Sequence, residues 1–490
     1  MHAQIVLDSV YQIIPNYPND MHAMVVDEDT LVIMQSLYDT TNNGWSINLF
    51  KMDTLGNILY SNLIVDSLGA HLRNLWGNKM IKTSDGGYAY AAGYVHNPAC
   101  EDCIFLAKYK HSGEIDYVKY YQKPDTSYTL FAINNLLQLE DGGYFLFSFY
   151  YDENYVSVPH LIRTDAEGTE LWSRDYPATG DTSVIFHGVT AIPNQKYILS
   201  GLKVNYNGPT PFGLSYMIII DSLGNIMKES LGEGEANWSD EILPTDDGGY
   251  LQLISKTKFT PYHSTKSLGG IRKLDSTLKE EWVRYIDFAP IPGAMYTSLV
   301  KTLDGNYVAC GPRGLDGTGK TSMHIKISDT GDVIWERFDK AHWNGEEAYV
   351  NRPRAIGVLS SGSTVSVGSA FTFSGGELGW VFKITPGGCV YDTVGCWPAQ
   401  PDATQNPMET IDISVYPNPA TDELTIQLTG DLHQKAYIYF YDVTGRFLRK
   451  QRLDLTYNIL TISDLPKGMI FYTINSTEGV LRHGKLVVDR

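Results

Sequence analysis

The feature that most constrains this chain is a turn motif that recurs along most of its length. Asp-Gly-Gly-Tyr occurs at residues 85–88, 141–144 and 247–250, and looser copies continue the series. Seven copies at a near-constant spacing of 53 to 57 residues indicate an array of one repeated unit. The residues at the tyrosine position of the motif are 31, 88, 144, 197, 250, 307 and 364.

Each repeat reads as four short strands. Asp-Gly and Gly-Gly pairs supply positive φ at little steric cost, so the motif predicts a hairpin turn between two strand-like runs. A third run, a second turn such as Asp53 to Asn57 and a fourth run follow. No window has a sustained helical period. A four-stranded antiparallel unit of about 50 residues is typical of a propeller blade, whereas a β-helix rung would be about half that length or less. The sequence therefore predicts an all-β chain with a seven-bladed β-propeller over residues 1–397.

Two features predict how the blades are held together. The fourth run of most repeats carries an aromatic residue, such as Trp172, Trp282 or Trp335, which we expect to pack between neighbouring blades. The seventh repeat lacks a good fourth strand. We expect the N-terminal segment, residues 5–14, to supply that strand and close the ring, which would leave no open sheet edge.

The charge of the chain limits its partners. Lys and Arg number 38 and Asp and Glu number 56, a formal charge of −18. Residues 412–490 contain nine acids and nine bases, so the whole deficit lies in the body. An acidic body argues against nucleic acid and anionic membranes as partners. No stretch approaches the roughly 20 apolar residues of a membrane helix, so no membrane-spanning segment is predicted.

The five cysteines predict loop staples in an oxidising compartment. Cys100 and Cys103 form a C-x-x-C, and Cys389 and Cys396 are close in sequence. Neither pair has the partner ligands of a zinc site or the βαβ setting of a redox motif. Cys310 lies inside a strand-like run, where we expect a small core residue.

The repeat pattern ends before a polar, proline-rich stretch. Residues 398–411 read as a linker. Residues 412–490 then alternate strand-like runs with Pro-Asn-Pro, Thr-Gly and Lys-Gly turns. This pattern predicts a small Ig-like β-sandwich of about 80 residues.

The order of motifs in residues 412–490 resembles a known family, the type A C-terminal sorting domain of the type IX secretion system of Bacteroidota. The residues that carry the likeness are Tyr416, Pro417, Asn418 and Pro419, then Gly445 and Arg446, then Gly468, and finally Lys485. The resemblance implies recognition by the type IX secretion machinery and export to the outside of the cell or to its surface. It also implies removal of the domain and attachment of the body to a surface lipopolysaccharide. The body is similar, more loosely, to the D-G-G-Y repeat propellers found attached to such domains.

The body shows no signature of a known chemistry. It contains no G-x-S-x-G elbow, H-E-x-x-H helix, phosphate loop or dinucleotide fingerprint. The acid-rich turn at residues 245–248 is explained by its role as a turn. The sequence therefore predicts no catalytic residue, no metal site and no cofactor.

A ligand is most naturally sought at the mouth of the ring, where the innermost strands begin. Aromatic and carboxylate residues that converge on a concave mouth would suit a glycan or a peptide. The candidate residues are Trp76, Asn78, His187, Trp238, Asp240, Glu241, Tyr296, Glu346 and Tyr349.

Three hypotheses remain open from the sequence. The first is a secreted or surface-displayed binding or scaffold module. The alternative is an extracellular polysaccharide hydrolase or lyase, for which two or three carboxylates should meet within about 10 Å at the channel mouth. The third is a purely architectural adhesin, for which no well-formed pocket is expected.

Overall fold

The computed structural model divides the chain into two compact units, Met1–Gly395 and Cys396–Arg490. The boundary lies just before the predicted linker, which itself is outside the described residues. The structure describes residues 8–11, 19–39, 44–64, 71–72, 79–97, 100–122, 128–177, 182–205, 212–231, 239–258, 266–285, 295–314, 321–390, 412–429, 436–442, 447–453, 457–476 and 479–489.

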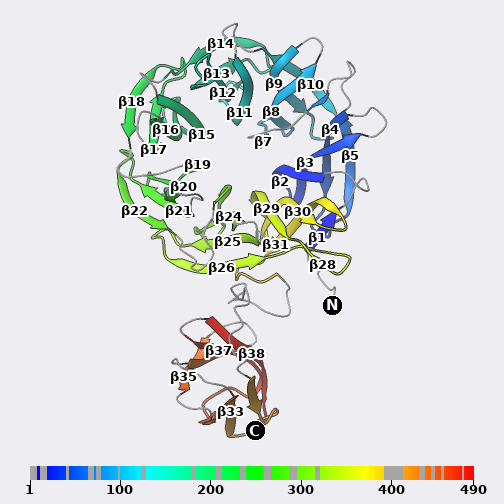
Figure 1. Cartoon of the computed structure of the whole chain (residues 1–490), viewed down its shortest axis with the longest axis vertical. Coiled ribbons are helices and arrows are strands. Elements are labelled where there is room, and N and C mark those ends of the chain that lie inside the picture. The colour runs from blue at the N-terminus through cyan, green and yellow to red at the C-terminus, as the bar shows by residue number, and fades with distance from the viewer. Residues whose placement is uncertain are drawn as a thin grey trace. The chain divides into compact units, whose positions relative to one another are not determined.

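The described part of the first unit is built from antiparallel sheets of four or five strands that surround a central axis (Figure 1). The first sheet contains β2 (Asn19–Asp27), β3 (Thr30–Asp39), β4 (Gly44–Met52) and β5 (Ile58–Ile64). The second contains β6 (His71–Leu72), β7 (Lys79–Lys82), β8 (Tyr88–Asn97), β9 (Cys100–Tyr109) and β10 (Ile115–Tyr121). The third contains β11 (Tyr128–Gln138), β12 (Tyr144–Tyr151), β13 (Ser157–Thr164) and β14 (Glu170–Asp175).

The remaining sheets of this unit follow the same order. The fourth contains β15 (Thr182–Ile192), β16 (Lys196–Asn205), β17 (Phe212–Ile220) and β18 (Ile226–Leu231). The fifth contains β19 (Ser239–Pro244), β20 (Tyr250–Lys258), β21 (Lys266–Leu274) and β22 (Glu280–Tyr285). The sixth contains β23 (Ser298–Lys301), β24 (Tyr307–Arg313), β25 (Thr321–Ile327) and β26 (Val333–Asp339). A hairpin of β27 (His342–Trp343) and β28 (Glu346–Glu347) precedes the last sheet, which contains β29 (Val350–Val358), β30 (Thr364–Thr372), β31 (Gly376–Ile384) and β1 (Asp8–Tyr11).

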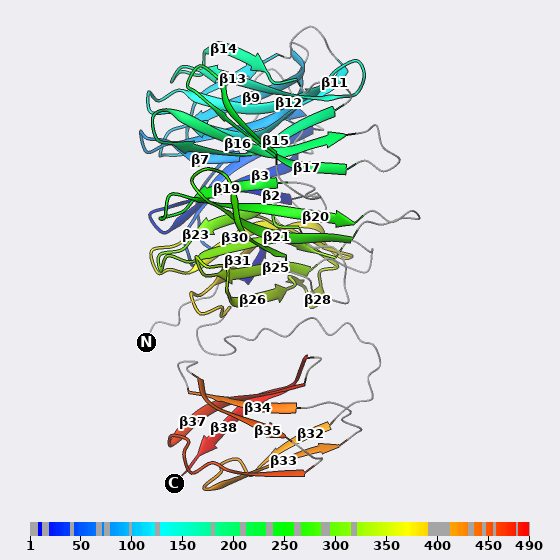
Figure 2. The ribbon, with the colours of Figure 1, turned by 90° about the vertical axis from the view of Figure 1, so that its left-hand side faces the viewer.

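This arrangement is a β-propeller. Each innermost strand contacts the innermost strand of the next sheet, and β29 of the last sheet contacts β2 of the first. The outer strand of the last sheet is β1, which pairs antiparallel with β31. Viewed from the side (Figure 2), the strands of each sheet run between the two faces of the unit. One face therefore carries the repeated turns, and the opposite face carries the ends at which the innermost strands begin.

The repeated motif forms the predicted hairpin turns, and its two glycines have separate roles. In the second sheet, Gly86 has a φ of 84° and its N–H donates to the Thr83 carbonyl at 2.9 Å. Gly87 is needed for close approach, because a Cβ there would lie 2.2 Å from the carbonyl oxygen of Tyr109. The motif thus joins the first two strands of a sheet while pressing against its third.

The aspartate of the motif has a partner that the sequence analysis overlooked. The third strand of most sheets carries a buried cation, and its charged group reaches the turn carboxylate. The pairs are Asp85–Lys108 at 2.8 Å, Asp141–Arg163, Asp247–Lys273 at 2.7 Å and Asp304–Lys326 at 2.7 Å. In the fourth sheet the motif has Asn194 and the third strand has Ile219 at the matching positions, so acid and base are lost together.

Aromatic packing between sheets follows the prediction. The aromatic ring of one fourth strand lies against the second-turn glycine of the next sheet. A Cβ at Gly113 would lie 2.3 Å from Tyr60, and one at Gly331 would lie 2.9 Å from Trp282. Where Lys228 replaces the aromatic residue, it donates a hydrogen bond of 2.7 Å to the Thr277 carbonyl. In that second turn, Leu278 also replaces the glycine, so the aromatic position and the glycine position change together.

The cysteines agree with the predicted staples as far as they are described. Cys103 and Cys389 are each part of a disulfide. Cys310 is free and buried, and burial raises the pKa of its thiol well above the ordinary value. A buried, neutral thiol is a core residue and not a nucleophile.

The second unit is a small two-sheet structure. One sheet contains β32 (Asp412–Tyr416), β33 (Glu423–Thr429) and β36 (Tyr457–Thr461). The other contains β34 (Ala436–Tyr441), β35 (Phe447–Leu453), β37 (Gly468–Ser476) and β38 (Gly479–Val488). Leu424 and Ile426 from the first sheet and Ile438, Phe440 and Ile474 from the second join one buried cluster. The unit therefore has its own hydrophobic core. Among the described residues of the chain, no helix has the length and apolarity of a membrane span.

Candidate functional site

The structure describes only part of the predicted channel mouth. Trp76, Asn78 and Trp238 lie outside the described residues. Asp240 lies in β19, but its side chain is not among those described. The remaining predicted residues, His187, Glu241, Tyr296, Glu346 and Tyr349, fall into three separate settings.

Glu241 forms a bridge across the central channel. Its carboxylate pairs with the ammonium group of Lys79, which lies on β7, three sheets away. The same carboxylate accepts hydrogen bonds from the Leu299 N–H at 2.6 Å and the Ser298 hydroxyl at 3.3 Å. With these partners, Glu241 is a neutralised structural carboxylate and not an available general acid or base.

His187 and Tyr296 are packing residues. His187 lies where the β15 register shifts beside β16, and its carbonyl accepts a hydrogen bond of 2.8 Å from the Asn135 side chain. Burial lowers the pKa of the His187 imidazole to about 4, so the ring is neutral at physiological pH. Tyr296 is 1% exposed and joins the apolar cluster of the fifth and sixth sheets. The Tyr296 ring does not contribute to an open surface, and His187 is partly buried.

Glu346 and Tyr349 come together around the turn between β30 and β31. The Glu346 carboxylate accepts hydrogen bonds from the backbone N–H groups of Phe373, at 2.5 Å, and of Ser374, at 3.0 Å. This holds the Phe373 ring on the ring of Tyr349, with centroids 4.5 Å apart and planes 26° apart. Phe373 is 86% exposed and Tyr349 is 38% exposed. We call this pair the aromatic platform. It lies at the start of the innermost strand β29, on the face of the predicted mouth.

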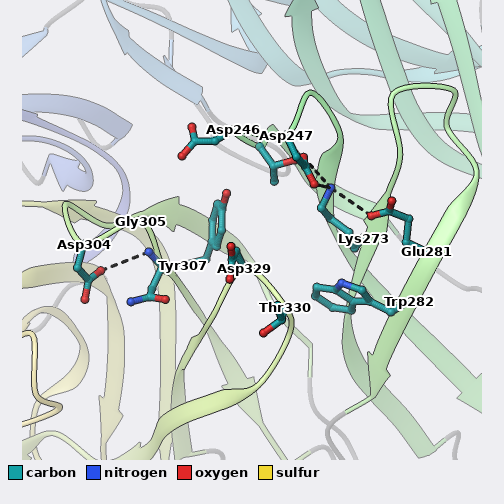
Figure 3. Close-up of a pocket in the computed structure, with 12 residues that line it drawn as sticks. Asp246, Asp247, Lys273, Glu281, Trp282, Asp304, Gly305, Tyr307, Asp329 and Thr330 are labelled. Atoms are coloured by element: carbon teal, nitrogen blue, oxygen red, sulfur yellow. Dashed lines mark hydrogen bonds and ion pairs between the residues drawn. The ribbon is translucent and has the colours of Figure 1, made fainter.

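A pocket of about 450 Å³ lies on the opposite face, between the fifth and sixth sheets (Figure 3). Its walls are the repeated turns of both sheets, the second turn of the sixth sheet, and the strands β21 and β22. The lining residues are Thr245, Asp246, Asp247, Lys273, Glu281, Trp282, Asp304, Gly305, Asn306, Tyr307, Asp329 and Thr330.

The electrostatics of this pocket are dominated by carboxylates. Its single lining ammonium group, on Lys273, lies 2.7 Å from Asp247 and 3.4 Å from Glu281. The hydrogen bond from Lys273 holds the pKa of the Asp247 carboxyl well below its usual range. Burial and the neighbouring Asp246 and Asp247 raise the pKa of Tyr307 to about 12, so its hydroxyl stays protonated. Among the described residues, no group of three or more His, Cys, Asp and Glu side chains has the geometry to hold a metal ion.

The predicted sorting residues lie on the second unit, where Asn418 connects two of the motifs. Its side-chain N–H donates to the Lys485 carbonyl at 2.8 Å, and its side-chain oxygen accepts the Val487 N–H at 2.8 Å. Tyr416 ends β32, Pro417 and Pro419 flank Asn418, and Gly468 begins β37 with a φ of 113°. Gly445 and Arg446 lie outside the described residues. The first motif is thus tied to the last strand of the unit.

Comparison with known families agrees with this reading of the second unit. Residues 414–489 match the family model described as "Secretion system C-terminal sorting domain". The chain is therefore a secreted or outer-cell-surface protein whose tail is directed to the type IX machinery. No curated protein matches the chain by sequence.

Solved structures resemble this chain only distantly. An alpha-L-arabinanase of Penicillium chrysogenum, complexed with arabinobiose, has 12% identity and a TM-score of 0.42, with 78% of this chain and 98% of that chain covered. The β-propeller domain of the Trilobed protease from Pyrococcus furiosus has 13% identity and a TM-score of 0.40, with coverages of 78% and 94%. A protein of unknown function from Dyadobacter fermentans has 9% identity and a TM-score of 0.41, with coverages of 77% and 97%. Likenesses at this level do not bear on activity.

Proposed function

We propose that this protein is a surface-displayed binding module: a seven-bladed propeller, closed by its N-terminal strand, that binds an extracellular glycan or peptide at its channel mouth. An Ig-like sorting domain of the Bacteroidota type carries it to the outside of the cell. The ring of sheets and the pairing of β1 with β31 support the seven-bladed closure.

The observation that carries the binding role is the aromatic platform of Tyr349 and Phe373. An exposed, stacked aromatic pair at the end of an innermost strand is unusual for a merely structural surface, because exposed large apolar groups that gather in one place mark interaction sites. Its flat faces suit the apolar faces of sugar rings or the side chains of a peptide. The hydrogen bonds from the turn to Glu346 keep the platform ordered before a ligand arrives.

The two predicted mouth carboxylates whose side chains the structure describes are both engaged by the chain itself. Glu241 is engaged by Lys79 and by the backbone of Leu299, and Glu346 is engaged by a turn. A glycosidase needs one carboxyl group free to give a proton and a second free to attack or to activate water. Neither residue is free in this sense.

An array experiment tests the proposal. The purified full-length chain is screened against immobilised glycans and peptides, and the hits are then tested with the double variant Tyr349→Ala and Phe373→Ala. We expect the hits to lose most of their signal. Leu303→Ala is a matched control, because Leu303 is 68% exposed but lies in a turn on the opposite face. An array without hits, or hits that the double variant leaves unchanged, would refute binding at the platform.

A further inference from the structure

The pocket between the fifth and sixth sheets is an opened version of an interface that is closed elsewhere in the same chain. Counting from the tyrosine of each motif, Asp246 and Lys301 correspond to Asp27 and Lys82 at the interface of the first and second sheets. The remaining correspondences at this interface are Tyr307 with Tyr88, Lys273 with Lys51, and Asp329 with His111. The two interfaces can therefore be compared residue by residue.

At the first interface, the chain itself supplies partners for the Asp27 carboxylate and the Tyr88 hydroxyl. The Asp27 carboxylate is 0% exposed and lies 3.0 Å from the Lys51 ammonium group, with Lys82 as a second ion-pair partner. The Tyr88 hydroxyl donates to the same carboxylate at 2.6 Å. The His111 ring covers this cluster, stacked on Tyr88 with centroids 6.2 Å apart and with Nδ1 3.5 Å from Asp27. Nitrogen-bearing side chains thus occupy the space above the tyrosine.

At the fifth and sixth sheets, the same space is left without an occupant from the chain. Lys273 points instead to Asp247 and Glu281, and the Asp246 side chain is 83% exposed with Lys301 as its ion-pair partner. Asp329 stands where the first interface has His111, so a carboxylate replaces an imidazole. The result is a pocket with five lining carboxylates and one ammonium group.

The hydroxyl group of a buried tyrosine faces this pocket. Tyr307 is 1% exposed, and its ring projects toward Asp246 and Asp247 in Figure 3. Among the described residues, no hydrogen-bond partner satisfies its hydroxyl, whereas the matching hydroxyl of Tyr88 donates to Asp27. The Tyr307 ring is buried, but its hydroxyl faces the open pocket, where it is free to exchange a hydrogen bond with a polar group of a ligand.

At the next interface, side chains and backbone of the chain itself fill the corresponding space. Between the sixth and seventh sheets, Trp335 is 2% exposed and its indole N–H donates to the Pro386 carbonyl at 3.1 Å. Lys326 also donates to that carbonyl, at 3.2 Å. Pro386 takes the position of Asp329, and Trp335 takes that of Trp282. Trp282 lies against Gly331 but is only partly buried and lines the pocket, so the part of its ring that faces the pocket can contact a ligand.

We propose that this pocket binds an arginine side chain of a partner protein or peptide. The guanidinium group would replace the nitrogen-bearing groups that fill the first interface. Its N–H groups can pair with Asp246 and Asp329 and can donate to the Tyr307 oxygen, and its plane can stack on Trp282. Arginine suits the site better than lysine because the acceptors are spread around the pocket and an aromatic face lines it. The site is on the face opposite the proposed channel-mouth site and does not depend on it.

Calorimetric titration of the full-length chain tests the proposal without any variant. The peptide Ac-Gly-Arg-Gly-NH2 should bind at one site per chain, more weakly as the ionic strength rises. The matched peptides with glutamine or glutamate in place of arginine should not bind. No heat of binding from the arginine peptide, or equal binding of the glutamine peptide, would overturn the proposal. Equally tight binding of the lysine peptide would overturn the choice of arginine.

Three variants then locate the site. Asp329→His rebuilds the first interface and should abolish binding, because the new imidazole covers Tyr307 as His111 covers Tyr88. Tyr307→Phe should weaken binding about tenfold by removing one hydrogen bond to a charged group. Glu153→Gln removes one exposed acid from a turn of another sheet and should leave binding unchanged. If the Asp329→His variant bound the arginine peptide with wild-type affinity, the proposed location of the binding site would be wrong. The thermal unfolding of each variant shows whether it is folded.

Discussion

The repeats allow one motif position to be tested in two environments, with opposite expectations. Asp27 and Asp246 hold the same position, four residues before the tyrosine position of their repeats. The Asp27 carboxylate is 0% exposed and its partner Lys51 is 10% exposed. The Asp246 carboxylate is 83% exposed and its partner Lys301 is 34% exposed. Replacing each aspartate by alanine therefore removes the same group from a buried and from an exposed ion pair.

The expected magnitudes differ several-fold. Asp27→Ala leaves the ammonium group of Lys51 buried and unpaired and removes the acceptor of Tyr88, which should lower the free energy of unfolding by about 3–5 kcal/mol. Asp246→Ala breaks a solvent-screened pair and should cost less than about 1 kcal/mol. The assay is equilibrium unfolding in urea, followed by tryptophan fluorescence and circular dichroism. The difference in midpoint multiplied by the slope gives the free-energy change.

The effect of Asp27→Ala should also depend on pH. Burial alone would raise the pKa of Asp27, but hydrogen bonds from Lys82, Tyr88 and Lys51 outweigh it and hold the pKa well below the usual range. The stabilisation is therefore complete above the unfolded-state pKa of about 4 and is lost as the pH falls below that value. Equal midpoint shifts for the two variants at neutral pH, or a larger shift for Asp246→Ala, would refute the reasoning from burial.

Three further predictions concern packing, protonation and the sorting domain. Gly113→Ala should lower the free energy of unfolding by about 1–3 kcal/mol more than Gly345→Ala. Both glycines have positive φ, but only at Gly113 would the added Cβ meet another side chain, that of Tyr60 at 2.3 Å. Equal urea midpoints for the two variants would contradict this prediction. Burial lowers the pKa of His324 to about 3, so the wild type should lose about 2 kcal/mol of its free energy of unfolding between pH 7 and pH 5. The variant His324→Leu should not show this loss. The same pH dependence in the variant and the wild type would contradict the prediction. Asn418→Ala should cost the second unit about 1–2 kcal/mol and speed hydrogen exchange at the Val487 amide, and unchanged exchange would show that the Asn418 bridge is dispensable.

The sequence predicted those features that depend on local chemistry and repetition. The turn glycines, the order of strands within a sheet and the aromatic contacts between sheets all follow from residue types at fixed positions. The buried cations of the third strands could also have been predicted from the sequence. Lys108, Arg163, Lys273 and Lys326 recur at one position of the repeat, and this position is the partner of the turn aspartate.

The features that the sequence did not predict depend on contacts between distant residues. Glu241 was a candidate ligand-binding residue because of its place at the mouth, but its charge is neutralised by Lys79, which lies 162 residues away. Phe373 was missed because nothing local indicates that Glu346 fixes its turn. The pocket was missed because Asp27 and Asp246 look alike in sequence. Whether each is buried depends on His111 or Asp329, which approach from the neighbouring sheet.

The most direct test of the account is the location of the first unit in a bacterium that has type IX secretion machinery. The full chain and a chain that ends at residue 411 are expressed with an epitope in the first unit, and intact cells are probed with antibody and protease. Because residues 414–489 match a sorting domain and the second unit has its own core, the shorter chain should fold but remain in the periplasm, while the full chain reaches the outside. Surface display of the shorter chain at the level of the full chain would contradict the account.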